Sequence, residues 1–259
     1  MKEYNVSLDE NYYSQRNNEI DSKNVCGPTN FIQGLKASGW EWDNSMLKQF
    51  RQPEDKLTYF VRTNKDVLKY YEKHYHNMYL NWWNESHKLA EERNAQYWNV
   101  ACVYSYPPNE VHDVMSYAVN LFVGYSAKDI ETMKRRPVTR FYNEFDENEV
   151  VWQICKKGAP VISSVDPFKN GGGHYITIVG LQVEDDFVAP TDYSQVQKKI
   201  CQTDKIKSYI IDNTYGRFNF ANKRYENVSG NNEKIDRDTF LSIMKPVSHY
   251  FTKGAACCC

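Results

Sequence analysis

The order in which two hydrophobic patterns occur along the 259-residue chain constrains its fold more than any other feature. Apolar side chains first recur at three- and four-residue steps, which predicts helices over 26–38, 40–100, 110–123 and 143–157. Runs rich in β-branched residues then predict strands over 159–165, 174–181, 207–212 and 218–225. Helices that precede neighbouring strands indicate an α+β fold with an antiparallel sheet.

The length of the chain fits one buried core that carries a sizeable insertion. We therefore expect a single domain over residues 1–253 with a helical insertion at about 45–145. Residues 254–259 contain three consecutive cysteines and are interpreted as a tail. Polar, turn-forming residues dominate 1–24, and 182–206 is expected to be a charged connection between two strands.

Charge and hydropathy exclude several classes of partner. The net charge of -1 provides no basic field for nucleic acid or a membrane surface. No apolar run approaches the ~20 residues of a membrane helix, so stable membrane insertion is not expected. The first residues lack the pattern of a secretory signal, and the seven cysteines lack a disulfide framework. We therefore expect a protein that is cytoplasmic as synthesised, with reduced thiols.

Cys26 and His174 are the first two candidate catalytic residues. Cys26 begins a predicted helix, where the positive end of the helix dipole favours the thiolate needed for nucleophilic attack. His174 opens a predicted strand after the glycines at 171–173, which leave space around the ring of a candidate general base. The alternatives are a small buried cysteine, which is also the interpretation of Cys155, and a turn with an incidental histidine.

Three further residues are candidates for the remaining parts of the site. Asp212 and Asn213 end a predicted strand, and either side chain could orient the ring of His174, although such pairs also favour turns. Only one of the two can serve, because adjacent strand residues face opposite ways. Gln15 precedes Cys26 by eleven residues, and its side-chain amide could donate a hydrogen bond to an oxyanion.

Taken together, these segments resemble papain-fold cysteine peptidases, and most closely the bacteriocin-leader-processing peptidase family with its free-standing bacterial and phage relatives. The resemblance implies a papain-like fold with Gln15 at the oxyanion, Cys26 as nucleophile, His174 as base and Asn213 as orienting residue. This chain departs from the family pattern at Thr214, which replaces a proline, and at Asp212, which competes with Asn213. The resemblance does not extend to residues 45–145. The segments that carry it are 12–18, 25–30, 173–180 and 213–216.

The resemblance implies cleavage of an amide or peptide bond through a thioester acyl-enzyme. The first expectation is a peptidoglycan amidase or endopeptidase of the phage endolysin type, released to the cell wall by a holin. The alternatives are a protease that acts on a protein or leader peptide, and a non-catalytic papain-fold binding or virion module. Peptide or peptidoglycan is therefore the expected partner.

No cofactor or metal is expected from the sequence. His74 and His76 are two residues apart, so they point to different faces of a helix. The polar stretch 17–21 contains the oxygen atoms that Ca²⁺ prefers, but turn formation is the favoured role for these side chains.

Overall fold

The computed structural model describes residues 1–7, 12–100, 105–132, 137–165, 167–168, 173–243 and 247–251. After the short strand β1, helices dominate the first half of the chain and strands the second half, in agreement with the α+β prediction. The helices are α1 (Cys26–Ala37), α2 (Pro53–Thr63), α3 (Lys65–His74), α4 (His76–Arg93), α5 (His112–Phe122), α6 (Ala127–Glu131), α7 (Glu147–Cys155), α8 (Ser194–Gln197) and α9 (Arg237–Ile243). Short 3₁₀ helices are η2 (Gln15–Asn17), η3 (Tyr97–Asn99), η4 (Pro108–Glu110) and η5 (Thr203–Lys205).

The described strands form one seven-stranded antiparallel sheet and a separate hairpin. In the sheet the order is β2–β9–β3–β4–β5–β8, and β1 pairs with the second half of β4. The central strand β4 therefore has β5 on one edge, and β3 and β1 in succession on the other. The strands are β1 (Lys2–Asn5), β2 (Thr139–Tyr142), β3 (Val161–Val165), β4 (Gly173–Val183), β5 (Ile206–Asn213), β6 (Phe218–Asn219), β7 (Arg224–Tyr225), β8 (Gly230–Asp236) and β9 (Val247–Phe251).

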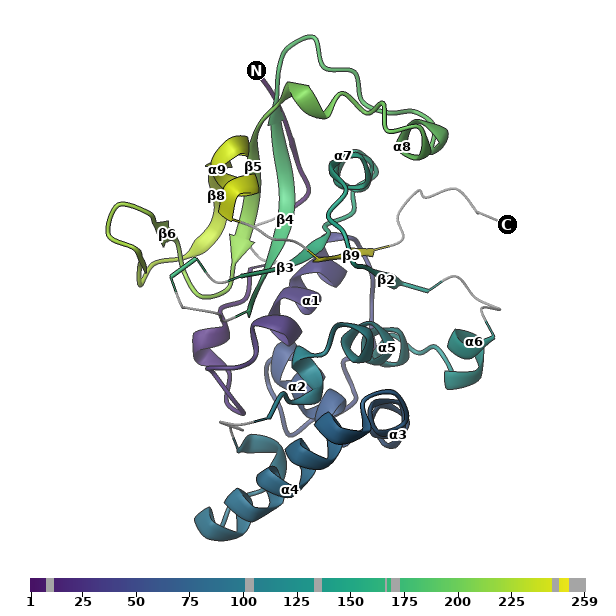
Figure 1. The fold of residues 1–259 in the computed structure, drawn as a ribbon, viewed down its shortest axis with the longest axis vertical. Coiled ribbons are helices and arrows are strands. Elements are labelled where there is room, and N and C mark those ends of the chain that lie inside the picture. Colours follow the sequence, from purple (N-terminus) through teal and green to yellow (C-terminus); the bar gives the residue numbers. More distant parts are fainter. Residues whose placement is uncertain are drawn as a thin grey trace.

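Helix α1 packs against one face of the sheet, and the other helices of the first half gather beyond it (Figure 1). The core on this side joins α1, α2 and α5 to Val161 and Tyr175 of the sheet. A second core lies on the opposite face, where α7 and α9 cover Ile176, Ile178 and Ile211. Residues of β4 therefore contribute alternately to the two cores, as the period of two in a strand requires.

Local signals explain where α1 begins and ends. Pro28 lies in the first turn, where its missing N–H removes no helical hydrogen bond. Gly39 has a φ of 71°, and Trp40 N donates to Leu35 O across this reversal at 2.9 Å. The predicted helix 26–38 and the predicted strands 159–165, 174–181 and 207–212 are thus confirmed within one or two residues at most ends.

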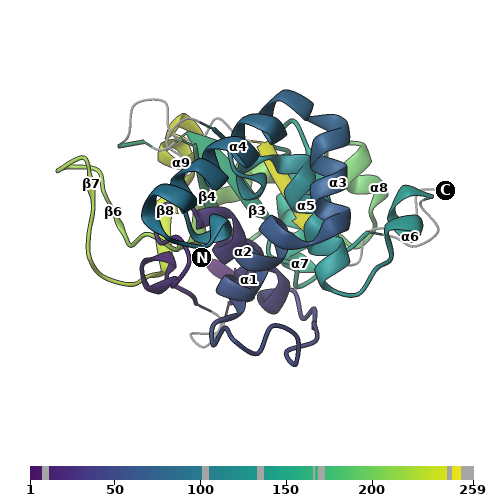
Figure 2. The same ribbon diagram turned by 90° about the horizontal axis from the view of Figure 1, so that it is seen from below.

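Other elements differ from the prediction. The fourth predicted strand, 218–225, is wrong as one strand, because β6 and β7 form a hairpin that projects from the body in Figures 1 and 2. Asn219 Oδ1 accepts from Asn222 N, and Lys223 has a φ of 49°, so this sequence forms a turn. The stretch 40–100 is not one helix but three, since Asn64 caps α3 and Tyr75 interrupts the path into α4.

The sequence prediction also missed β1, β2, β8 and β9 among the described strands. Strand β2 lies within 45–145, the range predicted as a helical insertion, yet it pairs with β9 of the main sheet. Residues 171–172, Cys102 and the predicted tail at 254–259 lie outside the described residues. Within the described part of the chain, no helix combines the length and the apolar character that crossing a membrane requires.

Candidate active site

Cys26 is the first residue of α1 and is partly exposed. The helix therefore directs its unpaired N–H groups and the positive end of its dipole toward this residue. The next residue must be small, because a Cβ on Gly27 would lie 2.8 Å from Asn109 O and 3.5 Å from the Tyr175 ring. The first turn of α1 is thus in close contact with η4 on one side and β4 on the other.

His174, the second residue of β4, contacts Asn213 at the end of β5. Its Nε2 lies 2.9 Å from Asn213 Oδ1, and both side chains are buried. Asn213 Oδ1 also accepts a hydrogen bond from Tyr215 N at 3.1 Å, so this atom is the amide oxygen. His174 Nε2 must then be the donor, which makes Nδ1 the basic nitrogen of the neutral ring.

Asp212 points away from His174 and has other partners. Its Oδ2 accepts from Ser7 Oγ at 3.0 Å, and its Oδ1 accepts from Asn232 N at 2.8 Å. The alternation of side chains along β5 explains this separation. Of the two candidates for orienting the histidine, Asn213 therefore makes the contact, and Asp212 joins β5 to β8 and to the residues that follow β1.

Gln15 is buried at the start of η2, and its side-chain amide has a defined orientation. Gln15 Oε1 accepts from Thr214 Oγ1 at 2.9 Å, so Nε2 is the donor end and contacts Ser22 O at 3.3 Å. The backbone joins the same two segments, since Gln15 N donates to Thr214 O at 3.1 Å. The structure thus places Gln15 beside the Asn213 segment.

The segments 12–16 and 213–215 run side by side although about two hundred residues separate them in the chain. Tyr12 Oη donates to Asn213 O at 3.0 Å. Arg16 Nε donates to Tyr215 O at 2.9 Å, and its guanidinium lies 4.8 Å from the centre of the Tyr215 ring. Two of the segments that carry the sequence resemblance are therefore in direct contact with each other.

Asn30 connects the candidate residues and was not identified from the sequence. Its Nδ2 lies 2.8 Å from both Cys26 O and Tyr175 O, and 3.2 Å from Thr214 Oγ1. Because one nitrogen contacts the carbonyls of Cys26 and Tyr175, the start of α1 lies close to the residue that follows His174. No local signal in the sequence distinguishes it, because Thr29 and Gln33 of the same helix are also polar and fully buried.

A second histidine lies near the candidate site and was also missed. Tyr175 Oη is 2.8 Å from His112 Nδ1, and the His112 ring stacks on Phe141. Burial raises the pKa of Tyr175 well above its ordinary value, and the neighbouring Cys26 adds to this rise. Burial lowers the pKa of His112, which favours a neutral ring next to the tyrosine.

The other described cysteines differ from Cys26 in position. Burial raises the pKa of Cys155 and of Cys201 to about 11, so both are protonated thiols at neutral pH. Cys155 ends α7, whereas Cys201 lies in the connection before β5. Neither is at the beginning of a helix, where a thiolate is favoured.

The side chain of Asn18, from the stretch considered for calcium, forms a local turn. Asn18 Oδ1 accepts from Ile20 N and from Asp21 N, as expected for a turn. Among the described residues, no group of three or more histidine, cysteine, aspartate or glutamate side chains is arranged to hold a metal ion.

Comparisons of the chain with protein-family models, with curated proteins and with solved structures found no match.

Proposed function

We propose that the chain is a papain-like cysteine hydrolase that cleaves amide or peptide bonds through a thioester acyl-enzyme. One observation carries the proposal, namely the 2.9 Å contact between His174 Nε2 and Asn213 Oδ1. This contact leaves Nδ1 as the basic nitrogen of a histidine on β4, the strand that packs against the helix headed by Cys26. Nucleophile, base and orienting amide are the three parts that covalent catalysis of this type requires.

In the acylation step, His174 Nδ1 takes the proton of the Cys26 thiol, and the thiolate attacks the carbonyl carbon of the substrate. An S–C bond forms, and the carbonyl π electrons move to the oxygen. When the C–N bond breaks, His174 Nδ1–H donates its proton to the leaving amine. The products are a free amine and a thioester on Cys26.

Deacylation uses the same groups in reverse. His174 Nδ1 takes a proton from water while the water oxygen bonds to the thioester carbon. The C–S bond then breaks, and the proton returns to the cysteine–histidine pair as the carboxylic acid product leaves. The result is hydrolysis of one amide bond with the protein unchanged.

Gln15 is proposed as the side-chain donor to the oxyanion, with the backbone N–H of Cys26 as the second donor. The support is the orientation of the Gln15 amide. Its oxygen accepts from Thr214 Oγ1, and its nitrogen, which contacts Ser22 O at 3.3 Å, has a second N–H for the oxyanion. A buried, oriented amide needs little rearrangement when negative charge develops on the substrate oxygen.

Peptidoglycan is the proposed substrate, cleaved as by an amidase or endopeptidase. This part of the proposal rests on the resemblance of segments 12–18 and 213–216 to free-standing relatives that act in cell-wall lysis. The bond would join an acyl carbon to an amine in the peptide part of the wall. Its cleavage therefore creates new amine ends.

Two linked experiments test the proposal. Iodoacetamide labelling with peptide-level mass spectrometry is expected to modify Cys26 at pH 6, where Cys155 and Cys201 remain protonated. Incubation with purified sacculi is expected to release new amine ends with the wild-type protein and none with Cys26→Ala.

The outcomes separate the alternatives. Cys26 could react with iodoacetamide while the protein leaves sacculi intact and cleaves members of a peptide library. That result would favour a protease acting on a protein or leader peptide. A Cys26 no more reactive at pH 6 than Cys201 would overturn the hydrolase proposal and favour a non-catalytic binding or virion module.

A further inference from the structure

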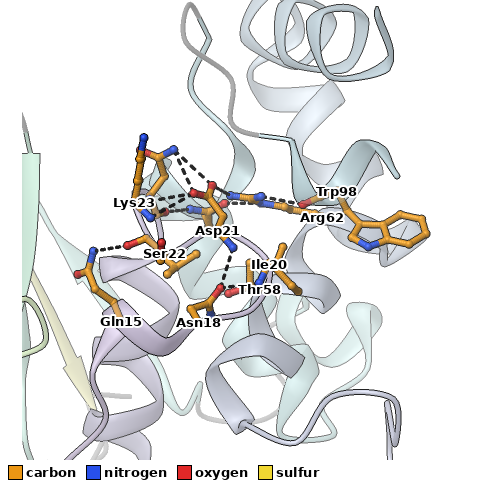
Figure 3. Close-up of polar contacts among 12 residues, drawn as sticks. Gln15, Asn18, Ile20, Asp21, Ser22, Lys23, Thr58, Arg62 and Trp98 are labelled. Atoms are coloured by element: carbon orange, nitrogen blue, oxygen red, sulfur yellow. Dashed lines mark hydrogen bonds and ion pairs between the residues drawn. The ribbon is translucent and has the colours of Figure 1, made fainter. Parts of the chain in front are cut away.

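The loop between Gln15 and Cys26 is held by a buried ion pair from the helical region. Asp21 Oδ2 lies 2.9 Å from Arg62 Nη2 of α2, and the two side chains are only 4% and 2% exposed. Figure 3 shows the aspartate between its own loop and the guanidinium. A fully desolvated pair of this kind persists only when further hydrogen bonds satisfy both charges.

The other guanidinium nitrogens of Arg62 are satisfied as well. Arg62 Nε donates to Asn109 Oδ1 at 2.9 Å, and Nη1 donates to Trp98 O at 2.8 Å. The planar fork of arginine thus joins the loop, η4 and η3 in fixed directions. A lysine could supply the charge, but it could not make these three contacts at once.

Asp21 transmits this geometry to the residues just before Cys26. Its Oδ1 accepts from the backbone N–H groups of Lys23 and Asn24 at 3.3 and 3.2 Å. Asn109 Nδ2 also donates to Asn24 O at 2.6 Å. The chain is therefore held two residues before the nucleophile.

Asn109 also constrains the chain on the other side of Cys26. Its carbonyl oxygen would lie 2.8 Å from a Cβ on Gly27, so the backbone of η4 closely approaches the first turn of α1. One residue of the helical region thus contacts the chain both before and after the nucleophile. Neither contact involves a group that would touch the substrate in the proposed reaction.

We propose that Arg62, Asp21 and Asn109 are positioning residues that set the place of the Cys26 thiol relative to His174. This inference rests on the proposed function, and it deepens that function by giving α2 and η4 a role in the site. The physical reason is that replacing a buried ion pair by apolar residues is often neutral or stabilising, so stability alone does not account for its presence. The need for a fixed backbone at Asn24 and Gly27 accounts for the presence of the buried ion pair.

The test measures the rate of iodoacetamide alkylation of Cys26 against pH in the full chain, by peptide-level mass spectrometry. The variants are Arg62→Met, Arg62→Lys and Asn109→Ala. The control is Arg237→Met, which breaks an arginine–carboxylate pair with Glu147 on the sheet side of the molecule, where the two side chains are 27% and 17% exposed. Thermal unfolding of each variant is measured in parallel, because Arg62→Met leaves Asp21 buried and unpaired.

In the proposed catalytic pair, a displaced Cys26 thiolate is stabilised less by protonated His174, so the pKa of the thiol rises. We expect the profile of Arg62→Met to shift upward by about one pH unit, which corresponds to about tenfold slower alkylation at pH values below the midpoint of the profile. Arg62→Lys and Asn109→Ala are expected to show smaller shifts in the same direction. Arg237→Met is expected to keep the wild-type profile.

Two results would overturn the inference. If folded Arg62→Lys and Asn109→Ala lose thermal stability but keep the wild-type alkylation profile, the residues serve stability alone while the hydrolase proposal stands. If wild-type Cys26 itself shows the profile of an ordinary thiol, the hydrolase proposal fails and the positioning role falls with it. The wild-type profile thus tests the function, and the difference between variant and wild type tests the inference.

Discussion

Two buried polar networks hold the segment that carries Cys26, and they differ in charge. On the sheet side, Gln15, Thr214 and Asn30 form a neutral network of amide and hydroxyl groups. On the helical side, Asp21 and Arg62 form a charged pair at 2.9 Å. Both are almost inaccessible to solvent, so the comparison isolates the effect of charge at similar burial.

The difference in charge predicts how much stability each network loses when one of its side chains is removed. A neutral group left without its partner loses a hydrogen bond and pays a moderate desolvation penalty. An ion left without its counter-ion in the same environment is far less stable, because the interior cannot replace water around a full charge. Deletions on the helical side should therefore reduce stability more than deletions on the sheet side.

The largest effect is expected for Asp21→Ala. It leaves the Arg62 guanidinium buried without a counter-ion and frees the N–H groups of Lys23 and Asn24. We expect the free energy of unfolding to fall by about 3–5 kcal/mol, as for other broken buried pairs. Urea denaturation monitored by tryptophan fluorescence measures this change.

The matched control is Glu3→Ala, which breaks a pair with Lys234 whose side chains are 41% and 47% exposed. Solvent screens this pair, so the expected loss is below about 1 kcal/mol. Equal losses for the two variants would show that burial of the charge on the helical side does not dominate its energetics.

The second effect also belongs to the helical side and depends on pH. Glu54, in the first turn of α2, is fully buried, and its carboxylate has no hydrogen-bond partner on any other described residue. Burial raises its pKa from 4.5 to about 7, and the neighbouring Asp55 adds to the rise. The folded state thus retains a proton that the unfolded state releases between these two pH values.

The sign of the effect follows from proton linkage. Below pH 4.5 the carboxyl group is protonated in both states and does not oppose folding. As the pH rises toward 7, the free energy of unfolding should fall by on the order of 3 kcal/mol and then level off. Glu54→Gln should reduce this fall in thermal unfolding measured at constant ionic strength, whereas Glu72→Gln on the exposed face of α3 should not. An unchanged slope in Glu54→Gln would place the cause elsewhere.

The two networks also differ in how far the sequence could predict them. Gln15, Cys26, His174 and Asn213 stand out because each has a distinctive local context, such as a helix start or a strand end. The partners Asp21 and Arg62 have no such context, since they are forty-one residues apart and meet only through the packing of α2 against the loop. The hydrophobic periodicity of a sequence does not reveal a contact between two polar residues so far apart in the chain.

The strands show the same limit. The β-branched runs of β3, β4 and β5 allow these strands to be predicted from the sequence. Strand β8, in contrast, has the polar sequence of Gly230–Asp236 and becomes a strand by pairing with β5. Tertiary pairing overrides local propensity there. Thr214 is a milder case, because in the sequence it was only a replacement for proline. The structure gives its hydroxyl two partners that a proline could not have.

The third effect tests the neutral network at Thr214. Thr214→Val removes the donor to Gln15 Oε1 and the acceptor for Asn30 Nδ2 while keeping the shape of the side chain. We expect a loss of about 1–2 kcal/mol in the free energy of unfolding. Hydrolysis should also slow by about tenfold, since the oxyanion donor loses its orientation. Thr214→Ser keeps the hydroxyl and should retain most of both quantities.

This pair of variants separates stability from catalysis. If Thr214→Val loses stability but hydrolyses sacculi as fast as wild type, the Gln15 amide does not depend on Thr214 for its orientation. If Thr214→Ser loses as much stability and hydrolysis rate as Thr214→Val, the methyl group of Thr214 rather than its hydroxyl determines both quantities.

The smallest effect is expected at the edge of the neutral network, for Tyr12→Phe. The Tyr12 hydroxyl donates to Asn213 O at 3.0 Å and accepts from Gly230 N at 3.1 Å, so it links the entry segment to β5 and β8. Because the residue is only partly buried, water can replace the lost partner, and the free energy of unfolding should fall by about 0.5–1 kcal/mol. Urea denaturation measures this change, with hydrolysis expected to stay near the wild-type rate because the side chain of Asn213 keeps its contact with His174. A loss as large as that of Asp21→Ala would mean that the neutral network is as sensitive as the charged one, and the contrast between the two sides would fail.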